Sequence, residues 1–359
     1  MSSLFRFLVS ISSKPIFPSQ INKRSISVLA MENPSSSLLI LCGKSPVEIE
    51  VAHSLKNNKN LKLPDNTDLL LHLQSEMEEQ TEEESFRIKY YMSSLSTDCF
   101  GKFLIWSPRL TSTHDIVSHN FSELPVGTVC VADVQFKGRG RSKNVWESPK
   151  GCLMFSFTLQ MEDGRVVPLL QYVVTLAMTE ALNAICDANG LPHLGVKIKW
   201  PNDLYLNGMK VGGVLCTSTY RSKKFNVSTG IGLNVDNEEP TICLNAALRE
   251  ISSNAYQLRR EDILVEFFKK FENLFGIFLN EGFQALEELY YKSWLHSGQR
   301  VVIQEKGDDQ KVEDVVVTIQ GLTTSGYLLG FGEDNQMYEL HPDGNSFDFF
   351  KGLIRRKLD

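Results

Sequence analysis

The order of apolar and polar positions along the chain predicts strands through its middle part. Runs that are apolar, or that alternate with polar residues, indicate strands when turn residues bound them. Such runs occur at 127–135, 151–160, 196–200, twice within 204–215, and at 225–235. Asn207-Gly208, in the middle of 204–215, favours a tight turn, so we expect two short antiparallel strands there.

Helical periodicity separates and follows these strands. Between Pro168 and Gly190, apolar residues recur every three or four positions, with proline in the first turn and glycine at the stop. The same spacing runs through 260–280, which is rich in phenylalanine, and through 283–294. We therefore expect three helices whose apolar faces pack into the core.

After Gly298 the pattern changes to short strands between turn residues, which predicts a small all-β unit. The predicted fold class is α/β of the α+β type: a central mixed, mostly antiparallel sheet with helices on one face, plus a small C-terminal β-barrel domain. The predicted divisions are a leader at 1–34, an N-terminal extension of uncertain fold at 35–100, a central domain at 101–297 and the β-barrel domain at 298–359.

Composition narrows the class of protein. The chain has 359 residues, 42% hydrophobic and 22% charged, as is typical of a globular protein, and its apolar runs are too short to cross a bilayer. A net charge of -6 argues against a broad nucleic-acid surface, which needs many cations. The seven cysteines are scattered without a Cys-x-x-Cys pair, so we predict no metal site made by the protein. We expect neither a nucleic-acid nor a membrane partner.

The first thirty residues differ in composition from the rest. They hold four cations, many serines and no acidic residue before Glu32. Such a leader is typical of an organellar transit peptide, so we expect import into a chloroplast or a mitochondrion. Translation begun at Met31 would omit this leader and leave a cytosolic product.

Positive charge is concentrated in one loop, KGRGRSKNVW, at 137–146. Gly138 and Gly140 allow backbone N–H groups to converge on an anion. Arg139 and Arg141 add planar guanidinium groups, which match a carboxylate or a phosphate with two hydrogen bonds. Taken alone, such a loop is as typical of a solvated basic turn as of an anion site.

Three further segments combine polar side chains with turns or small residues. KWPND at 199–203 is equally typical of a turn closed by its own Asn and Asp side chains. In NGMKVGG at 207–213, a lysine follows a tight turn and precedes two glycines that would let a ligand approach. TGIGLNV at 229–235 places an asparagine beside two glycines, which a β-bulge would also explain. Together with the basic loop, these segments favour an anion-binding site.

The motifs GRGRSKNVWESPKG, KWPNDLYLNGMKVGG and GIGLNV, in this order and spacing, resemble the signature of the biotin protein ligases of eukaryotic, plant type, also called holocarboxylase synthetases. The resemblance extends from about Leu104 to Phe349. STHD at 112–115 is similar to the family segment that contacts biotin, although His114 stands where many members have asparagine.

This resemblance implies two half-reactions. The carboxylate of biotin attacks the α-phosphate of ATP, which carries Mg²⁺, to give biotinyl-5′-adenylate and pyrophosphate. A lysine of a biotin carboxyl carrier domain, the part of a carboxylase that is modified, then displaces AMP. The segment 101–297 would be the biotin- and ATP-binding ligase domain, and the loop at 138–146 would fold over the adenylate.

The same resemblance implies the site residues. Lys210 and Arg139 would face the biotin carboxylate and the α-phosphate, and Asp203 would orient or deprotonate the acceptor lysine. The implied biotin-binding residues are Ser112, Thr113, His114, Gln135, Gly138, Arg139, Lys210, Gly213, Gly230 and Gly232. The implied ATP or adenylate contacts are Arg141, Trp146, Lys199, Asn202, Lys210 and Asn234.

Two alternatives stay open on the sequence. A lipoate ligase or an octanoyl transferase resembles this fold, but we do not expect it to carry GRGRSKNVW together with KWPND. A biotin-sensing transcriptional regulator would need an N-terminal DNA-binding domain, whereas 35–100 lack a clear basic recognition helix and include an acidic run. We expect a monomer or a weak homodimer.

Overall fold

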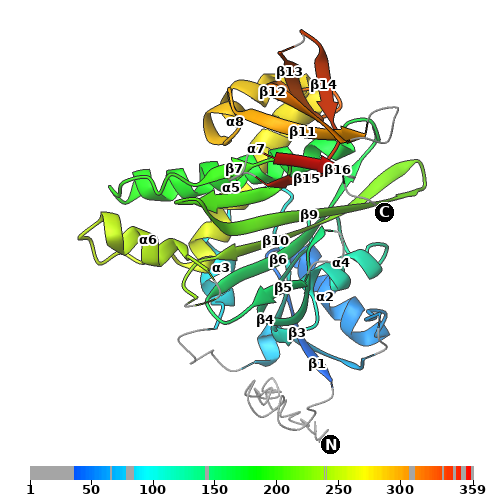
Figure 1. Ribbon diagram of the computed structural model, residues 1–359. Coiled ribbons are helices and arrows are strands. Elements are labelled where there is room, and N and C mark those ends of the chain that lie inside the picture. Colours follow the sequence, from blue (N-terminus) through cyan, green and yellow to red (C-terminus); the bar gives the residue numbers. More distant parts are fainter. Residues whose placement is uncertain are drawn as a thin grey trace, which may run out of the picture.

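The computed structural model describes residues 36–64, 67–77, 85–141, 145–237, 239, 241–306, 312–333, 335–342, 345–348 and 353–356. A large central sheet and a smaller C-terminal sheet are the main features in Figure 1. The predicted leader at 1–34, with Met31, lies outside the described residues.

The central sheet has ten strands in the order β2-β1-β3-β4-β6-β10-β9-β8-β7, with β5 paired to β4. Their bounds are β1 Ser37–Gly43, β2 Leu69–Leu73, β3 Phe103–Leu110, β4 Val129–Arg139, β5 Val145–Ser148, β6 Cys152–Met161, β7 Lys197–Lys199, β8 Asp203–Leu206, β9 Met209–Arg221 and β10 Lys224–Asn234. The β1–β2 and β3–β4 pairs are parallel, and the other described pairs are antiparallel. The predicted mixed, mostly antiparallel sheet is therefore confirmed.

Two tight turns connect the strands that follow β7. The predicted turn at Asn207 and Gly208 joins β8 to β9, and both residues have positive φ angles, 50° and 77°, as such a hairpin turn requires. A second hairpin joins β9 to β10 through Ser222 and Lys223, whose φ angles are 53° and 64°. The sequence did not predict this second turn, because neither residue type favours a positive φ.

One face of the central sheet carries the predicted helices. The helical elements that follow β6 in the chain are η3 Val167–Leu169, α5 Leu170–Ala188, α6 Leu244–Ile251, α7 Arg260–Glu281, η4 Phe283–Leu286 and α8 Glu287–Ser293. An earlier helix, α3 Ile88–Ser94, contacts α7. Phenylalanines of β6 and α7 form the centre of this layer: the rings of Phe155 and Phe267 meet edge to face with centroids 5.2 Å apart. The three helices predicted from apolar spacing are confirmed.

The other face of the sheet carries α2 Pro46–Asn58 and α4 Thr113–His119, so the expectation of helices on one face is corrected. The reason lies in β1, where both faces are buried. Leu38 and Ile40 belong to the main core, whereas Leu39 and Leu41 belong to a second core with Ala52 of α2. A strand with both faces apolar needs a cover on each side.

The N-terminal extension continues the central sheet. The elements β1, α2 and β2 form a βαβ unit with parallel strands, followed by η1 Gln74–Glu76, and β1 pairs antiparallel with β3. Glu272 of α7 also accepts hydrogen bonds from the backbone N–H groups of Asp98 and Cys99. Strands on both sides of residue 100 thus share one sheet, and the division of the chain there stays a prediction.

Helix α5 is the central apolar element of the fold. With the preceding turn it spans Val167–Ala188, which is long and apolar enough to cross a membrane by length and composition. The expectation that the apolar runs are too short to cross a bilayer is therefore corrected. Most of the segment is buried between the sheet and α7 in the described structure, so the core accounts for its apolar composition.

The C-terminal region forms a separate sheet in the order β14-β13-β12-β11-β16-β15. Its strands are β11 Arg300–Lys306, β12 Val312–Leu322, β13 Leu328–Gly332, β14 Met337–Leu340, β15 Asn345–Asp348 and β16 Leu353–Arg356. The separate all-β unit is confirmed. In the described pairings, β14 and β15 are the two edge strands of this sheet. A closed barrel, as predicted, would pair these two edge strands with each other.

Candidate active site

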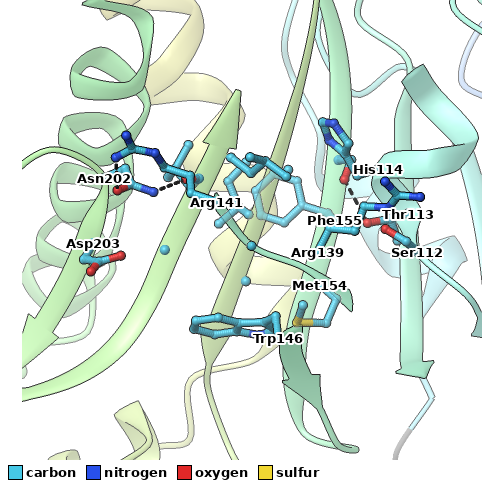
Figure 2. Close-up of a pocket in the computed structure, with 18 of the residues that line it drawn as sticks. Ser112, Thr113, His114, Arg139, Arg141, Trp146, Met154, Phe155, Asn202 and Asp203 are labelled. Carbon is cyan, nitrogen blue, oxygen red and sulfur yellow. Dashed lines mark hydrogen bonds between the residues drawn. The ribbon is translucent and has the colours of Figure 1, made fainter. Parts of the chain in front are cut away.

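A cavity of about 580 Å³ opens where α4, the β4–β5 connection, the β7–β8 turn, β9 and β10 converge. Most of the predicted site residues line it. They are Ser112, Thr113, His114, Gln135, Arg139, Arg141, Trp146, Lys199, Asn202, Asp203, Lys210, Gly213, Gly230 and Gly232. Figure 2 shows Ser112, Thr113 and His114 on one side and Arg141, Asn202 and Asp203 on the other. Segments more than 100 residues apart in the chain therefore form one site.

One side of the cavity is a network of buried neutral polar groups. The side-chain oxygen Oε1 of Gln135 accepts hydrogen bonds from the backbone N–H of Thr113 at 2.7 Å and from the Thr113 hydroxyl at 3.0 Å. The Thr113 hydroxyl also lies 2.8 Å from the Ser156 hydroxyl. The side-chain nitrogen Nε2 of Gln135 donates to the Ser148 hydroxyl at 3.2 Å. These bonds fix the orientation of side chains that a polar, uncharged ligand group could reach.

Among the described residues that line this cavity, His114 is the one histidine. Its side chain is 6% exposed, and its Nε2 lies 2.9 Å from the Thr217 hydroxyl. The other ring nitrogen, Nδ1, is buried and has no hydrogen-bond partner in the described structure. It faces Gly230, where an added Cβ would lie 3.2 Å away. Burial, with the nearby Arg139, lowers the pKa of His114 to about 4, so the ring is neutral at physiological pH.

Two cations of the site are each held by a carboxylate. Arg139 Nε lies 2.8 Å from Oδ1 of Asp115, which is 7% exposed and belongs to the first turn of α4. Lys210 Nζ lies 2.6 Å from Oδ1 of Asp203, across the β8–β9 pair. An added Cβ at Gly213 would lie 3.3 Å from Asp203 Oδ1, so the small residue leaves this ion pair open to the cavity.

Trp146 of β5 lies across the floor of the cavity, beside Met154 in Figure 2. Lys210 Nζ lies 5.2 Å from the centroid of its ring, a cation–π distance. An added Cβ at Gly232 would come within 2.7 Å of the indole nitrogen, so only glycine allows Trp146 to lie this close to β10. Gly138 has the corresponding role in β4, because a Cβ there would meet the Trp146 carbonyl oxygen at 2.5 Å.

Arg141 connects three parts of the molecule. Its guanidinium donates to Oδ1 of Asn202 at 3.1 Å and to the carbonyl oxygen of Pro342 at 3.2 Å. Asn202 in turn donates to the carbonyl oxygen of Val214. The basic loop, the β7–β8 turn and the C-terminal sheet therefore meet at one side chain. Residues 142–144 of the loop lie outside the described residues.

Two predicted contacts do not line the described cavity. Gly138 lies behind it, in the β4–β5 pair. Asn234 is buried at the end of β10. Its side-chain Nδ2 donates to the Thr241 hydroxyl at 2.8 Å, and its Oδ1 accepts a hydrogen bond from the thiol of Cys152. Thr241 donates to the Lys210 carbonyl oxygen, so Asn234 supports the strand that carries Lys210. Its predicted contact with the adenylate stays a prediction.

The structure adds residues that the sequence analysis did not select. Ser156 and Asp115 hold predicted residues in place, and Pro342 comes from the C-terminal sheet. The remaining additions are Val145, Met154, Phe155, Trp200, Pro201, Val214, Leu215 and Ile231, and Gly140 of the basic loop also lines the cavity. One sequence signal was present for Ser156, since a serine inside the apolar run LMFSFTL needs a partner.

The arrangement suits an anionic ligand with a neutral polar head. Hydroxyl and amide groups line one side, together with Arg139 on Asp115 of α4, whereas Arg141 and the Lys210–Asp203 pair line the other, and an indole ring lies between them (Figure 2). Among the described residues, no group of three or more His, Cys, Asp and Glu side chains could hold a metal ion.

Comparisons with known proteins identify the family. Residues 106–234 match the Biotin/lipoate A/B protein ligase family, and residues 296–352 match the Biotin protein ligase C terminal domain. The chain is 64% identical to Biotin--protein ligase 1, chloroplastic, of Arabidopsis thaliana, over 99% of this chain and 96% of that protein. It is 33% identical to Biotin--protein ligase of Homo sapiens, over 76% of this chain and 38% of that protein.

A solved structure adds the fold. Biotin protein ligase from Aquifex aeolicus in complex with biotin and ATP superposes with a TM-score of 0.53 at 27% identity, covering 71% of this chain and 99% of that one. The C-terminal match and the two named relatives separate the biotin branch from the lipoate branch of the broader family. The motifs, the site and the near full-length similarity together show that this chain belongs to the biotin protein ligase family.

Proposed function

We propose that this chain is an ATP-dependent ligase that attaches biotin to a lysine of carboxylase carrier domains through biotinyl-5′-adenylate. The observation that carries the proposal is the cavity itself, in which a neutral polar wall from α4 and β4 meets two ion-paired cations that belong to the family motifs. The Arabidopsis relatives, 64% and 66% identical, are both named biotin–protein ligases.

In the first half-reaction, a carboxylate oxygen of biotin forms a bond to the α-phosphorus of ATP, and the bond to pyrophosphate breaks. Both reactants are anions, so the repulsion between them must be screened. We assign this to Arg139 and Lys210. Asp115 and Asp203 hold these two cations in the free chain, and each cation can turn to a substrate anion without leaving the cavity. Mg²⁺ would enter with the nucleotide.

In the second half-reaction, the amine of the acceptor lysine attacks the acyl carbon of the mixed anhydride, an amide bond forms, and AMP leaves with the bonding electron pair. The amine must first lose a proton. Asp203 is our candidate for orienting this amine or accepting its proton, because its carboxylate lies at the cavity wall next to Lys210.

The ligand contacts follow from the same geometry. We assign Ser112, Thr113 and Gln135 to the ring system of biotin, with His114 beside them, because neutral hydrogen-bonding groups gather there. Gly213, Gly230 and Gly232 would leave space for the ligand. Lys199, Asn202, Arg141 and Trp146 are assigned to the adenylate, and the division of labour among them is part of the proposal.

One observation bears on the DNA-binding alternative. The segment before residue 100 forms a βαβ unit within the central sheet, which differs from the helix-turn-helix that a DNA-binding regulator would need.

For the cellular address, the leader composition and the relative named chloroplastic support import into the chloroplast. A cytosolic product begun at Met31 rests on the sequence alone. A mitochondrial address rests on composition alone.

The direct test incubates the purified chain with biotin, Mg-ATP and the carrier domain of a carboxylase. We expect one biotinyl group on the carrier by mass spectrometry, and biotin-dependent release of pyrophosphate. Lipoate in place of biotin is the control for the substrate. Transfer of lipoate with no transfer of biotin would refute the proposal.

A further inference from the structure

The C-terminal sheet and the β7–β8 turn are joined by a short run of hydrogen bonds. Residues 294–296, just before β11, lie alongside β7: Trp294 bridges to Ile198, and the Leu295 N–H donates to the Ile198 carbonyl oxygen at 3.0 Å. At the next step along β7 a side chain takes part. The backbone N–H of Trp200 donates to Nε2 of His296 at 2.9 Å.

The His296 ring is held in one orientation and one protonation state. An N–H can only donate, so Nε2 must be the unprotonated nitrogen, and Nδ1 then carries the hydrogen that it shares with Oε1 of Gln299 at 2.9 Å. The ring is fully buried and packs edge to face on Trp294. Burial lowers the pKa of His296 to about 4, which keeps the ring neutral and able to accept.

The indole of Trp200 is anchored on the same side. Its Nε1–H donates to the Tyr172 hydroxyl at 3.0 Å and lies 3.3 Å from the carbonyl oxygen of Gly326, in the C-terminal sheet. The Tyr172 hydroxyl also donates to the Gly326 carbonyl oxygen, at 2.5 Å. Both N–H groups of Trp200 are therefore held by residues from outside the turn to which it belongs.

What this anchoring controls is the turn from Lys199 to Asp203. Trp200 and Pro201 line the cavity together with Lys199, Asn202 and Asp203. Asn202 and Asp203 are the partners of Arg141 and Lys210, respectively. A shift of the Trp200 backbone would move both of these partners, whereas the polar wall around Thr113 and Gln135 belongs to α4 and β4 and would stay in place.

We infer that His296 is a positioning residue: its ring accepts the Trp200 N–H and thereby sets the place of the Lys199–Asp203 turn in the active site. This rests on the proposed function, since the turn is assigned to the adenylate side. The C-terminal sheet thus acts on the chemistry through one buried imidazole as well as through the Pro342 contact to Arg141.

The test compares His296→Leu, which removes the acceptor and leaves the Trp200 N–H buried without a partner, with His296→Gln, whose carbonyl oxygen can reach the position of Nε2. The matched control is Val317→Ala. Val317 is fully buried in the same C-terminal sheet, paired with Val301 and Gly332, so this change destabilises the sheet from within β12.

Three quantities are measured on folded protein: kcat/KM for ATP from biotin-dependent pyrophosphate release, the Kd for biotin by calorimetry, and hydrogen exchange of the peptide 197–206. For His296→Leu we expect kcat/KM for ATP to fall tenfold or more, faster exchange in that peptide, and a biotin Kd within twofold of the original. We expect His296→Gln to recover kcat/KM for ATP to within about threefold, and Val317→Ala to leave all three quantities near the original.

Equal losses and equal exchange in His296→Leu and Val317→Ala would overturn the inference, because His296 would then act only through the stability of the sheet. If the original chain releases no pyrophosphate, the proposed function fails, and the exchange comparison still decides whether His296 holds the turn. If His296→Leu does not fold, Gln299→Leu takes its place: it removes the partner of Nδ1–H, and the same pattern is expected at smaller size.

Discussion

At the scale of single residues, two cations of the cavity are paired with carboxylates in the free chain. Asp115 holds Arg139 and Asp203 holds Lys210, so the two cations are oriented before an anionic ligand arrives. Arg139 and Lys210 are still partly exposed, with side chains 54% and 37% accessible, so a substrate can reach them. Cations that are already oriented lose less freedom when the ligand binds, which lowers the cost of binding.

Lys210→Ala should lower biotin-dependent pyrophosphate release at least a hundredfold, because the α-phosphate would lose its nearest assigned cation. The free energy of unfolding should change by less than about 1 kcal/mol, since a partly exposed ion pair contributes little to it. Stopped assays of pyrophosphate release and urea denaturation measure the two quantities.

Lys224→Ala is the control for Lys210→Ala, because Lys224 is an exposed lysine of the neighbouring strand β10. Its activity should equal that of the original chain. A folded Lys210→Ala variant with near-original pyrophosphate release would remove Lys210 from the chemical step.

The two buried imidazoles predict a pH dependence of stability. The pKa values of His114 and His296 are lowered from 6.5 to about 4 by burial, so the unfolded chain binds more protons than the folded chain between these pH values. Stability is therefore lost as the pH falls through this window. From pH 7 to pH 5 the free energy of unfolding should decrease by about 2 kcal/mol for each residue.

Urea denaturation at pH 7, 6 and 5 measures this decrease. In the double variant His114→Asn with His296→Gln, neither position titrates, and most of the decrease should disappear. The same decrease in the double variant as in the original chain would assign the effect to other groups.

At the scale of elements, the β4–β5 strand pair contributes to both the floor and the wall of the cavity. Gly138 allows the two strands to pair closely, Trp146 projects from β5 onto the floor, and Arg141 reaches from the end of β4 to the β7–β8 turn. One strand pair therefore carries an aromatic floor and a charged contact to the opposite wall.

Arg141→Gly should weaken retention of the adenylate more than its formation. The change removes the contacts to Asn202 and Pro342 and loosens the backbone, at a cost of about 2 kcal/mol in adenylate affinity. Arg139 and Lys210 stay in place, so biotinyl-adenylate should still form and then escape. Biotin transfer to serum albumin, measured beside transfer to the carrier domain, should rise.

Lys137→Gly is the control for Arg141→Gly, since it also replaces a cation of the segment 137–146 by glycine, but at an exposed position of β4 outside the cavity. It should leave albumin unmodified. Loss of both transfer activities in Arg141→Gly would place Arg141 in the chemical step and contradict the division of labour proposed for the loop.

At the scale of the whole molecule, two sheets enclose the site from different directions. The central sheet supplies most of the wall, and the smaller C-terminal sheet contributes Pro342 and holds Trp200 through His296 and Gly326 (Figure 1). The N-terminal βαβ unit extends the far edge of the central sheet, away from β7 and β8.

The leader predicts the address of the whole chain. Residues 1–30 fused to a fluorescent reporter should direct it into the chloroplast, because a basic, serine-rich segment without acidic residues is typical of transit peptides. A fusion of the chain begun at Met31 should stay in the cytosol. Fluorescence microscopy of both fusions measures this, and a diffuse reporter with the leader intact would contradict the prediction.

The amino-acid sequence by itself determined the parts of the site that are local in the chain. The Asn207-Gly208 hairpin and the glycines of β4 and β10 follow from turn chemistry and strand patterns over fewer than about twenty residues, whereas the site residues were assigned through the resemblance of the motifs to a family. The three core helices followed from apolar spacing for the same reason. A local pattern depends on neighbouring residues of the chain and does not depend on the residues that pack across the sheet.

Only the tertiary structure decided which residues meet across long separations. Asp115 finds Arg139, Thr113 finds Ser156, and His296 finds Trp200 through pairings 24, 43 and 96 positions apart in the chain. The helices on the second face of the sheet and the site contact from Pro342 were missed in the same way. A buried aspartate, serine or histidine carries in the sequence only its need for a partner, and the packing of distant elements determines which partner it finds.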